Sequence, residues 1–334
     1  MDQIPIVHIS DLHFSDRMTN NQFGWFEGYR PHDVQLCKGL TNVVEHIKYL
    51  WDLQEGESPR LIVTGDLTSS GRESEFAVAH SFIMSRWRLQ LAGPEKWAGQ
   101  HVSEGDLATV PGNHDHWFGR RVPPSAYNGG IIEDHFERTP WRKVWASSGG
   151  GFELEIFGVD SNSGLAGQWQ NWPAIGRIQK EELNELEWRL EESDRTHSPK
   201  SVRRVRAILT HHSLSYRGGL PKRIFSVCEL EEESRDRLLE IAAKYKVAAI
   251  LTGHIHDAYH HDFPVRIDGE ERIVRELRSP STLQGPASKV NAGFLAHRLW
   301  LDQNGALEWT VWHYRWDGSR FLQDKGPFER FNVG

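Results

Sequence analysis

Five short apolar runs in this chain each end in a polar patch, and helical patterns separate most of them. The runs have the length and composition of buried strands, and they lie at residues 5–9, 60–64, 107–110, 205–209 and 248–251. The patches that follow are Asp11-Leu12-His13, Gly65-Asp66, Gly112-Asn113-His114-Asp115, His211-His212 and Gly253-His254-Ile255-His256. Strands that alternate with helices predict βαβ units and an α/β fold. We therefore expect the patches to meet at one sheet edge, where the strand ends converge.

The remaining elements are also predicted from periodicity. Apolar positions recur at helical spacing near residues 34–51, 73–87, 177–190 and 230–245, and another strand is predicted near 152–159. After the last patch, strands near 273–277, 294–301 and 307–314 are joined by turns, which predicts antiparallel pairing. Two segments, 14–33 and 117–151, are rich in Gly, Pro, Asn and aromatic residues and fit no regular element. We interpret both as lids or substrate loops.

Length and charge limit the class of protein. A chain of 334 residues fits one domain with insertions, so we expect a single domain over 1–334, with the motif core at 4–257 and C-terminal antiparallel strands at 270–334. The balance of 39 basic and 46 acidic side chains gives a net charge of −7, which disfavours nucleic acid as a partner. Two cysteines outside any CxxC pattern, no leader-like start and no long apolar stretch predict a cytoplasmic protein without a membrane partner.

Each patch alone has an ordinary structural interpretation. Asp11 and His13 point the same way on an extended strand end and can bind one ion, but such triplets also form caps and turns. Gly65-Asp66 and Asn113 also fit turns. The pair His254 and His256 is stronger, because the glycine before it lets the backbone approach closely. The shared position of all the patches at strand ends favours one common site.

Together, the patches resemble the signature of the calcineurin-like metallophosphoesterase superfamily, in which DxH, GD, GNH(D/E), H and GHxH occur in this order. The matching elements span residues 11 to 256. The resemblance implies a four-layer αββα sandwich with two metal ions at the strand ends. It implies that one metal is bound by Asp11, His13 and His256 and the other by Asn113, His211 and His254, with Asp66 bridging both. His212 would then support the site or contact the substrate.

This set of ligands is chemically suited to a pair of metal ions. Oxygen and imidazole ligands without thiolates suit manganese, iron or zinc, in divalent or mixed-valence states, and do not choose between them. Two divalent ions facing only Asp11 and Asp66 leave about two net positive charges for hydroxide and phosphate. At a spacing of ~3.5–4 Å, such a pair activates water and holds the attacking and leaving oxygens. The expected reaction is in-line attack of metal-bound hydroxide on phosphorus.

The resemblance also implies roles for residues beside the metals. The family histidine that matches His114 lies over the substrate, so His114 is expected to act as general acid, worth roughly 10²–10⁴-fold in rate. Asp115 is expected to orient the His114 ring, with a helix cap as the alternative. Asp160 matches an Asp-Ser element that is frequent in this family and is expected to support the site.

The substrate is indicated by a softer similarity. Residues 65–76, GDLTSSGRESEF, resemble the cyclic nucleotide and glycerophosphodiester phosphodiesterase branch, which predicts a phosphodiester substrate, with a nucleotide as one candidate. A phosphomonoesterase and a single-strand nuclease are alternatives. Arg120 and Arg121, among aromatic residues, fit a loop that holds a second phosphate or stacks on a base, or else a solvated insertion. A non-catalytic metal-binding scaffold is disfavoured. Members of the superfamily that serve as scaffolds typically lose metal ligands, and this chain keeps them all.

Overall fold

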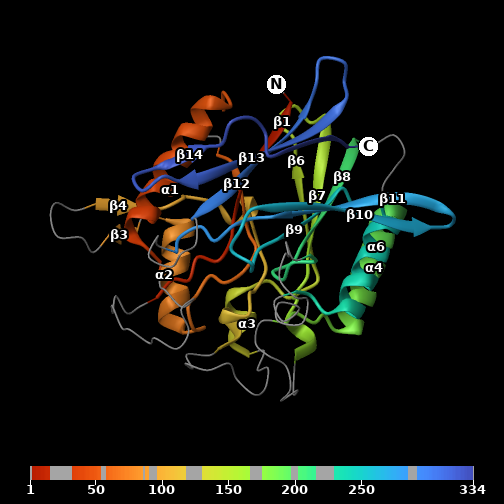
Figure 1. Ribbon diagram of the computed structural model, residues 1–334, viewed down its shortest axis with the longest axis horizontal. Helices are drawn as coiled ribbons and strands as arrows, with labels where there is room; N and C mark the ends of the chain where they lie inside the picture. The colour runs from red at the N-terminus through yellow and green to blue at the C-terminus, as the bar shows by residue number, and fades with distance from the viewer. Residues whose placement is uncertain are drawn as a thin grey trace.

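Two mixed β-sheets face each other and helices cover their outer faces (Figure 1). The computed structural model describes residues 2–15, 32–53, 58–85, 87–89, 96–117, 130–165, 175–196, 202–215, 229–284 and 292–333. The first sheet has the strand order β14-β13-β12-β1-β2-β5, with β15 paired to β13. The second has the order β10-β11-β9-β8-β7-β6.

The first sheet combines a parallel part with an antiparallel C-terminal part. Its strands are β1 (Gln3–Ile9), β2 (Arg60–Val63), β5 (Leu107–Thr109), β12 (Gly293–Leu301), β13 (Leu307–Trp316), β14 (Phe321–Gln323) and β15 (Glu329–Asn332). β1, β2 and β5 are parallel, whereas β12 joins β1 in the antiparallel sense. The outer helices are α1 (Val34–Leu50) and α2 (Glu73–Met84). Asp33 begins α1 by accepting hydrogen bonds from the backbone N–H groups of the first turn.

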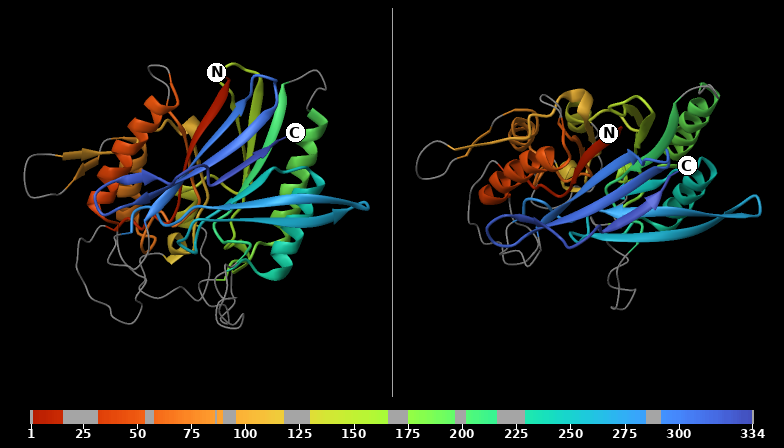
Figure 2. Two further views of the ribbon diagram at one scale, coloured as in Figure 1. Left: turned by 45° about the horizontal axis from the view of Figure 1, so that its top comes forward. Right: turned by 90° about the horizontal axis from the view of Figure 1, so that it is seen from above.

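The second sheet is parallel at its centre. Its strands are β6 (Trp141–Ala146), β7 (Phe152–Gly158), β8 (Arg203–Leu209), β9 (Ala249–Thr252), β10 (Tyr259–Ile267) and β11 (Glu270–Arg278). β7, β8, β9 and β11 are parallel, and β6 and β10 pair antiparallel at the edges. The helices α4 (Lys180–Thr196) and α6 (Glu232–Lys244) cover its outer face. The hairpin of β10 and β11 reaches beyond these helices (Figure 2).

Alternating side chains build three apolar layers. In β1, Ile4 and Ile6 face the second sheet, whereas Val7 and Ile9 face α1 and α2. In β7, Phe157 points away from the inter-sheet layer and packs with residues of α4 and α6. One buried cluster thus lies under α1 and α2, one between the sheets, and one under α4 and α6. The predicted four-layer αββα sandwich is confirmed.

Part of the predicted insertion over 117–151 is regular structure, so the prediction was wrong there. Residues 130–135 form α3 (Gly130–His135) and residues 141–146 form β6. Trp141 and Trp145 are buried in the inter-sheet layer, and Lys143 between them donates to the carbonyl of Leu107 (2.9 Å). Arg142 and Lys143 lie between the apolar residues of β6, so the sequence does not show a regular alternation of apolar and polar residues there.

The other predicted loop regions fall mainly on undescribed parts of the chain. Residues 16–31 and 118–129, which include Arg120 and Arg121, lie outside the described residues. Their roles as lids or substrate loops stay predictions. The smaller described elements are β3 (Trp87–Leu89), β4 (Lys96–Ala98) and the 3-10 turns η1 (Glu104–Asp106), η2 (His114–Trp117) and η3 (Ser163–Leu165). Within the described ranges, no helix has both the length and the apolar character needed to cross a membrane.

Candidate metal centre

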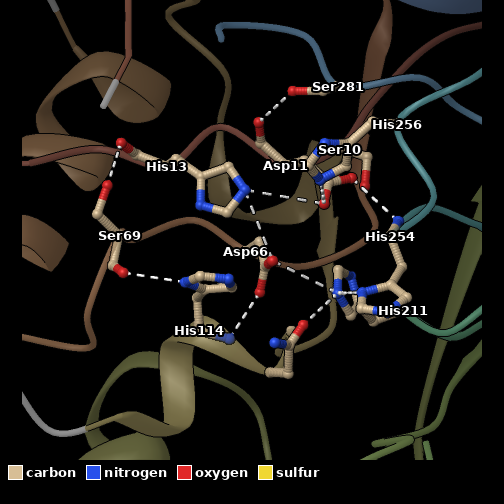
Figure 3. A network of polar contacts seen from close by, with 12 residues as sticks. Ser10, Asp11, His13, Asp66, Ser69, His114, His211, His254, His256 and Ser281 are labelled. Atoms are coloured by element: carbon tan, nitrogen blue, oxygen red, sulfur yellow. Dashed lines mark hydrogen bonds and ion pairs between the residues drawn. The ribbon is translucent and has the colours of Figure 1, made fainter. Parts of the chain in front are cut away.

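The predicted ligands come together where strands of the two sheets end (Figure 3). Asp11 and His13 follow β1, Asp66 follows β2, Asn113 follows β5, His211 follows β8, and His254 and His256 follow β9. Backbone hydrogen bonds join the first two loops, from Asp11 N to Gly65 O (3.1 Å) and from His13 N to Asp66 O (2.9 Å). The parallel strands therefore deliver side chains that are far apart in sequence to one place, as the sequence predicts.

The backbone at this place is strained. Asp11, His13, Asp66, His254 and His256 have φ angles of 52°, 49°, 53°, 72° and 62°. The left-handed region costs an L-residue about 1–2 kcal/mol, although Asp tolerates it better than most. Such conformations persist only where the surrounding structure holds them, and they cluster at functional sites.

Glycines let the ligand loops approach one another. A Cβ atom on Gly112 would lie 2.2 Å from Asp66 Oδ1, and one on Gly253 would lie 1.8 Å from Ser10 Oγ. Neither distance is possible for a real side chain, so larger residues at these positions would push the loops apart. The glycines of the GD, GNHD and GHIH patches thus have a steric role in building the site.

The first group of ligand atoms consists of Asp11, His13 and His256, whose nearest donor atoms lie within 4.8 Å of one another. Asp11 Oδ1 is 3.1 Å from His256 Nε2 and 3.9 Å from His13 Nε2. Asp11 Oδ1 and His13 Nε2 are buried and make no hydrogen bond of normal geometry to the described residues. Buried polar atoms are rarely left this way, and a cation between them would satisfy both.

The second group consists of Asp66, His211 and His254, again within 4.8 Å of one another. His211 Nε2 lies 3.1 Å from His254 Nδ1 and 3.1 Å from Asn113 Oδ1. The other ring nitrogen of His211 donates to the carbonyl of Thr64 (2.6 Å). This contact fixes the tautomer and leaves Nε2 as a lone-pair donor, which is how proteins orient histidine ligands.

Asp66 lies between the two groups. Its Oδ2 is 3.7 Å from His13 Nε2 and 3.6 Å from His211 Nε2. Its Oδ1 accepts a hydrogen bond from the backbone N–H of His114 (2.8 Å). One carboxylate oxygen therefore faces ligands of both groups while the other fixes the side chain.

The charges of the site favour cations. Burial alone would raise the pKa of Asp11, but the imidazole of His256 and its neighbours lower it well below its usual value. Burial and the nearby Asp11 carboxylate raise the pKa of Asp66. Burial also lowers the pKa values of His13 and His211, so both rings are neutral, as metal ligands must be. The donor set of carboxylate, amide and imidazole atoms fits two divalent transition-metal ions.

His114 lies beside the ligands and is held by the backbone. Its Nδ1 donates to the carbonyl of Ser69 (3.0 Å), and its ring meets His13 edge-on at 4.7 Å between centroids. The other ring nitrogen is directed toward Asp66 (Figure 3). Burial lowers the pKa of His114 to about 4, so the ring is neutral before substrate binds. A negatively charged ester beside it would favour the protonated ring.

Asp115 has a different partner from the one predicted. Its carboxylate accepts hydrogen bonds from the N–H groups of Leu67, Thr68 and Gly112 and from the Thr68 hydroxyl, at 2.8–3.2 Å. The Ser69 carbonyl, not this carboxylate, provides the hydrogen bond at His114 Nδ1. The orienting role predicted for Asp115 was therefore wrong, because the loop after β2 turns its backbone donors toward this side chain. Asp115 ties that loop to the loop after β5.

We expect Asp115→Asn to lower the free energy of unfolding by about 2–4 kcal/mol, because the charged acceptor is lost and an amide N–H faces buried donors. Urea denaturation measures this change. The control is Asp262→Asn, which breaks a partly exposed ion pair with Arg275 and should cost under about 1 kcal/mol. Equal effects of the two substitutions would contradict the anchoring role.

His212 is fully buried and packs its ring against that of His254, at 4.3 Å between centroids. Its Nδ1 contacts the hydroxyl of Ser161 (2.8 Å). This burial favours the supporting role over direct contact with substrate. Asp160, next to Ser161, forms an ion pair with His116 at 3.3 Å, and its N–H donates to Glu182 of α4 (2.8 Å). The Asp-Ser element thus lies in a polar layer behind the ligands.

Glu182 in this layer predicts a pH dependence of stability. Burial, followed by the charge of Asp160, raises its pKa from 4.5 to about 7. The protonated carboxyl stabilises the fold fully below pH 4.5, and this contribution is lost as the pH rises through about 7. We expect Glu182→Gln to flatten the decline in unfolding free energy between these pH values, whereas Glu185→Gln, at a half-exposed position on the same helix, should not. Denaturation at a series of pH values measures both, and parallel curves for wild type and Glu182→Gln would refute the assignment.

Several contributors to the site were missed from the sequence. The carbonyls of Thr64 and Ser69 act through the backbone, so no residue type marks them. The hydroxyl of Ser281, which donates to the Asp11 carbonyl (3.1 Å), comes from a segment 270 residues away. His116 directly follows the GNHD patch, and its residue type was a signal that could have been used.

Comparisons with known proteins found one matching family model and distantly similar structures. The family model described as calcineurin-like phosphoesterase matches residues 4–258. A structure of GAP50, the anchor in the inner membrane complex of Plasmodium, is 10% identical with a TM-score of 0.53, and the alignment covers 100% of this chain and 89% of that one. A predicted phosphoesterase from Streptococcus pneumoniae is 12% identical with a TM-score of 0.32, with 99% of both chains covered. The search of curated proteins found no match.

Proposed function

The chain belongs to the calcineurin-like phosphoesterase family, and we propose that it is a metal-dependent phosphodiesterase. The observation that carries the proposal is the position of Asp66 Oδ2, 3.7 Å from His13 Nε2 and 3.6 Å from His211 Nε2. A carboxylate oxygen shared by two clusters of imidazoles is the arrangement that a two-metal hydrolase requires.

The residues that would hold the metals follow from the two groups. One ion would be held by Asp11, His13 and His256. The other would be held by Asn113, His211 and His254, and Asp66 would contact both ions. Manganese, iron and zinc all suit these donors. When bound, such a pair lowers the pKa of water and neutralises charge on the phosphoryl group.

The chain's own residues would position the ester and move a proton. The Ser69 carbonyl holds His114 at Nδ1 (3.0 Å), so the opposite nitrogen faces the site. From there, His114 would donate a proton to the leaving oxygen once the bound ester has raised its pKa. The loops around the site exclude water from its base, because Asp11, Asp66 and His211 are at most 1% exposed.

The preference for diesters rests on the similarity of residues 65–76 to the phosphodiesterase branch. These residues include Asp66 and the Ser69 carbonyl, which contact His114, and this proximity to the proposed metals supports the proposal. A nucleotide diester is the substrate that we would screen first. A cytoplasmic location stays a prediction.

The test is turnover of bis-p-nitrophenyl phosphate and p-nitrophenyl phosphate by the chain reconstituted with manganese, iron or zinc. We expect faster hydrolysis of the diester. Preference for the monoester would make the protein a phosphatase, and cleavage of single-stranded oligonucleotides above both would make it a nuclease. No hydrolysis with any metal would overturn the proposal in favour of a binding scaffold.

A further inference from the structure

Two charged side chains of β11, Glu276 and Arg278, are fully buried behind the candidate metal centre. β11 pairs in parallel with β9, and Arg278 lies opposite Thr252, the last residue of β9. The end of β11 therefore reaches the loop that carries His254 and His256. Burying two charges is costly unless both are fully hydrogen-bonded, so their contacts indicate what they are for.

Arg278 joins two ligand loops. Its Nη1 donates to Ser213 Oγ and to the carbonyl of Ser215, both at 2.6 Å, in the loop after His211. Its Nε donates to the carbonyl of Asp257 (3.2 Å), and its Nη2 lies 2.8 Å from Asp257 Oδ1, in the loop after β9. The guanidinium also lies over the ring of Tyr259 at 4.8 Å. Because its donors form a rigid planar fork, Arg278 fixes the separation of the two loops.

Glu276 completes the same arrangement. Its Oε1 accepts hydrogen bonds from Ser213 Oγ (2.6 Å), Leu214 N (3.0 Å) and Thr252 Oγ1 (2.8 Å), and its Oε2 accepts from Ser215 Oγ (2.6 Å). Both charged side chains contact Ser213, so the positive and negative groups compensate each other through a shared hydroxyl. The loop after His211 is therefore held by both charges and the loop after β9 by Arg278.

His256 is the ligand that depends most on this support. Its backbone has a φ of 62°, and its side chain is 24% exposed, whereas that of His211 is 0% exposed and held by the Thr64 carbonyl. Asp257 is the next residue in the chain, and Arg278 contacts both its carbonyl oxygen and its Oδ1. A left-handed conformation persists only while its surroundings hold it. Releasing Asp257 would let His256 move away from Asp11.

We propose that Arg278 is a positioning residue that fixes His256 and thereby sets the metal affinity of the group Asp11, His13 and His256. This inference rests on the proposed metal-dependent function. Loss of a contact that orients a metal ligand typically costs 10- to 100-fold in metal affinity. We expect Arg278→Met to raise the Mn²⁺ dissociation constant of one of two sites by roughly 10- to 100-fold and to leave the other nearly unchanged.

Calorimetric titration of the metal-free chain with Mn²⁺, together with electron paramagnetic resonance, measures this effect. At low Mn²⁺, the variant should show a mononuclear signal where the wild type shows a spin-coupled pair, and excess Mn²⁺ should restore turnover. The matched control is Arg275→Met, on the same strand, which removes an ion pair with Asp262 and touches neither ligand loop in the described residues. It should bind both ions as the wild type does.

A second variant covers the case in which Arg278→Met leaves Glu276 uncompensated and does not fold. Asp257→Ala removes the salt bridge by changing a side chain that is 43% exposed. Only Nη2 of Arg278 loses its partner, because Nε and Nη1 keep their hydrogen bonds. It should weaken the same site in the same direction. Wild-type affinity at both sites in every folded variant would overturn the inference alone. A wild-type chain that binds no Mn²⁺ would instead overturn the proposed function.

Discussion

Asp66→Asn should lower phosphodiester turnover by roughly 10³-fold or more while the protein stays folded. Asparagine keeps the shape of the side chain, tolerates the left-handed φ of 53° and can still accept the hydrogen bond from His114 N. It removes the negative charge that lies between His13 and His211, and the neutral amide is a poor bridge between cations. We therefore expect loss of at least one metal ion per chain together with the loss of turnover, measured by metal analysis and steady-state kinetics.

The control for Asp66→Asn is Glu182→Gln, another acid-to-amide change at a buried position. Glu182 contacts the backbone of Asp160, behind the ligands, and joins neither ligand group. Its variant should retain two metals and most of the activity. If Asp66→Asn instead binds two ions and turns over at a rate near that of the wild type, Asp66 does not bridge the site.

His114→Asn should retain both metal ions and lose roughly 10²–10⁴-fold in kcat. A ring nitrogen of His114 also lies within 4.8 Å of ligand atoms of His13 and Asp66, but the group Asp11, His13, His256 and the group Asp66, His211, His254 each have an aspartate and two histidines without it. Its hydrogen bond from Nδ1 to the Ser69 carbonyl directs the opposite nitrogen toward the ester. The substitution removes the proton donor without removing a ligand, so turnover should fall while the metal content stays unchanged.

The leaving group distinguishes proton donation from a merely structural role. A phenyl ester needs protonation of its leaving oxygen more than a p-nitrophenyl ester does, because phenolate is the more basic leaving group. The loss of kcat in His114→Asn should therefore be larger for phenyl esters than for p-nitrophenyl esters. Equal losses for both would argue against His114 as the proton donor, and loss of metal would make it a ligand.

The candidate ligands could be selected from the sequence because residue type and position both mark them. Asp11, His13, Asp66, His211 and His254 stand just past apolar runs, and parallel strands bring such positions to one edge. The structure adds what a linear pattern cannot contain, namely which oxygen of Asp66 lies between the two groups. Arg120 and Arg121 lie outside the described residues, so their predicted contact with substrate stays a prediction.

The errors have physical causes. Asp115 was expected to orient His114, yet an aspartate next to a histidine in sequence can equally well anchor a loop. The backbone N–H groups of Leu67 and Thr68 point at its carboxylate, and the sequence does not show this. The strand β10 was missed because its first half, Tyr259-His260-His261-Asp262, is polar, and its apolar face consists only of Phe263, Val265 and Ile267, which pack against the cluster under α4 and α6. Arg278 carried no sequence signal at all, because a buried arginine cannot be told from a surface one by type alone.

Anomalous diffraction from crystals of the chain loaded with Mn²⁺ would test most directly whether two metal ions bind at this site. Two peaks ~3.5–4 Å apart are expected, one among Asp11, His13 and His256 and the other among Asn113, His211 and His254, with Asp66 bound to both. A single peak, no peak, or a pair of ions that leaves Asp66 uncoordinated would contradict the two-metal centre and the hydrolytic function built on it.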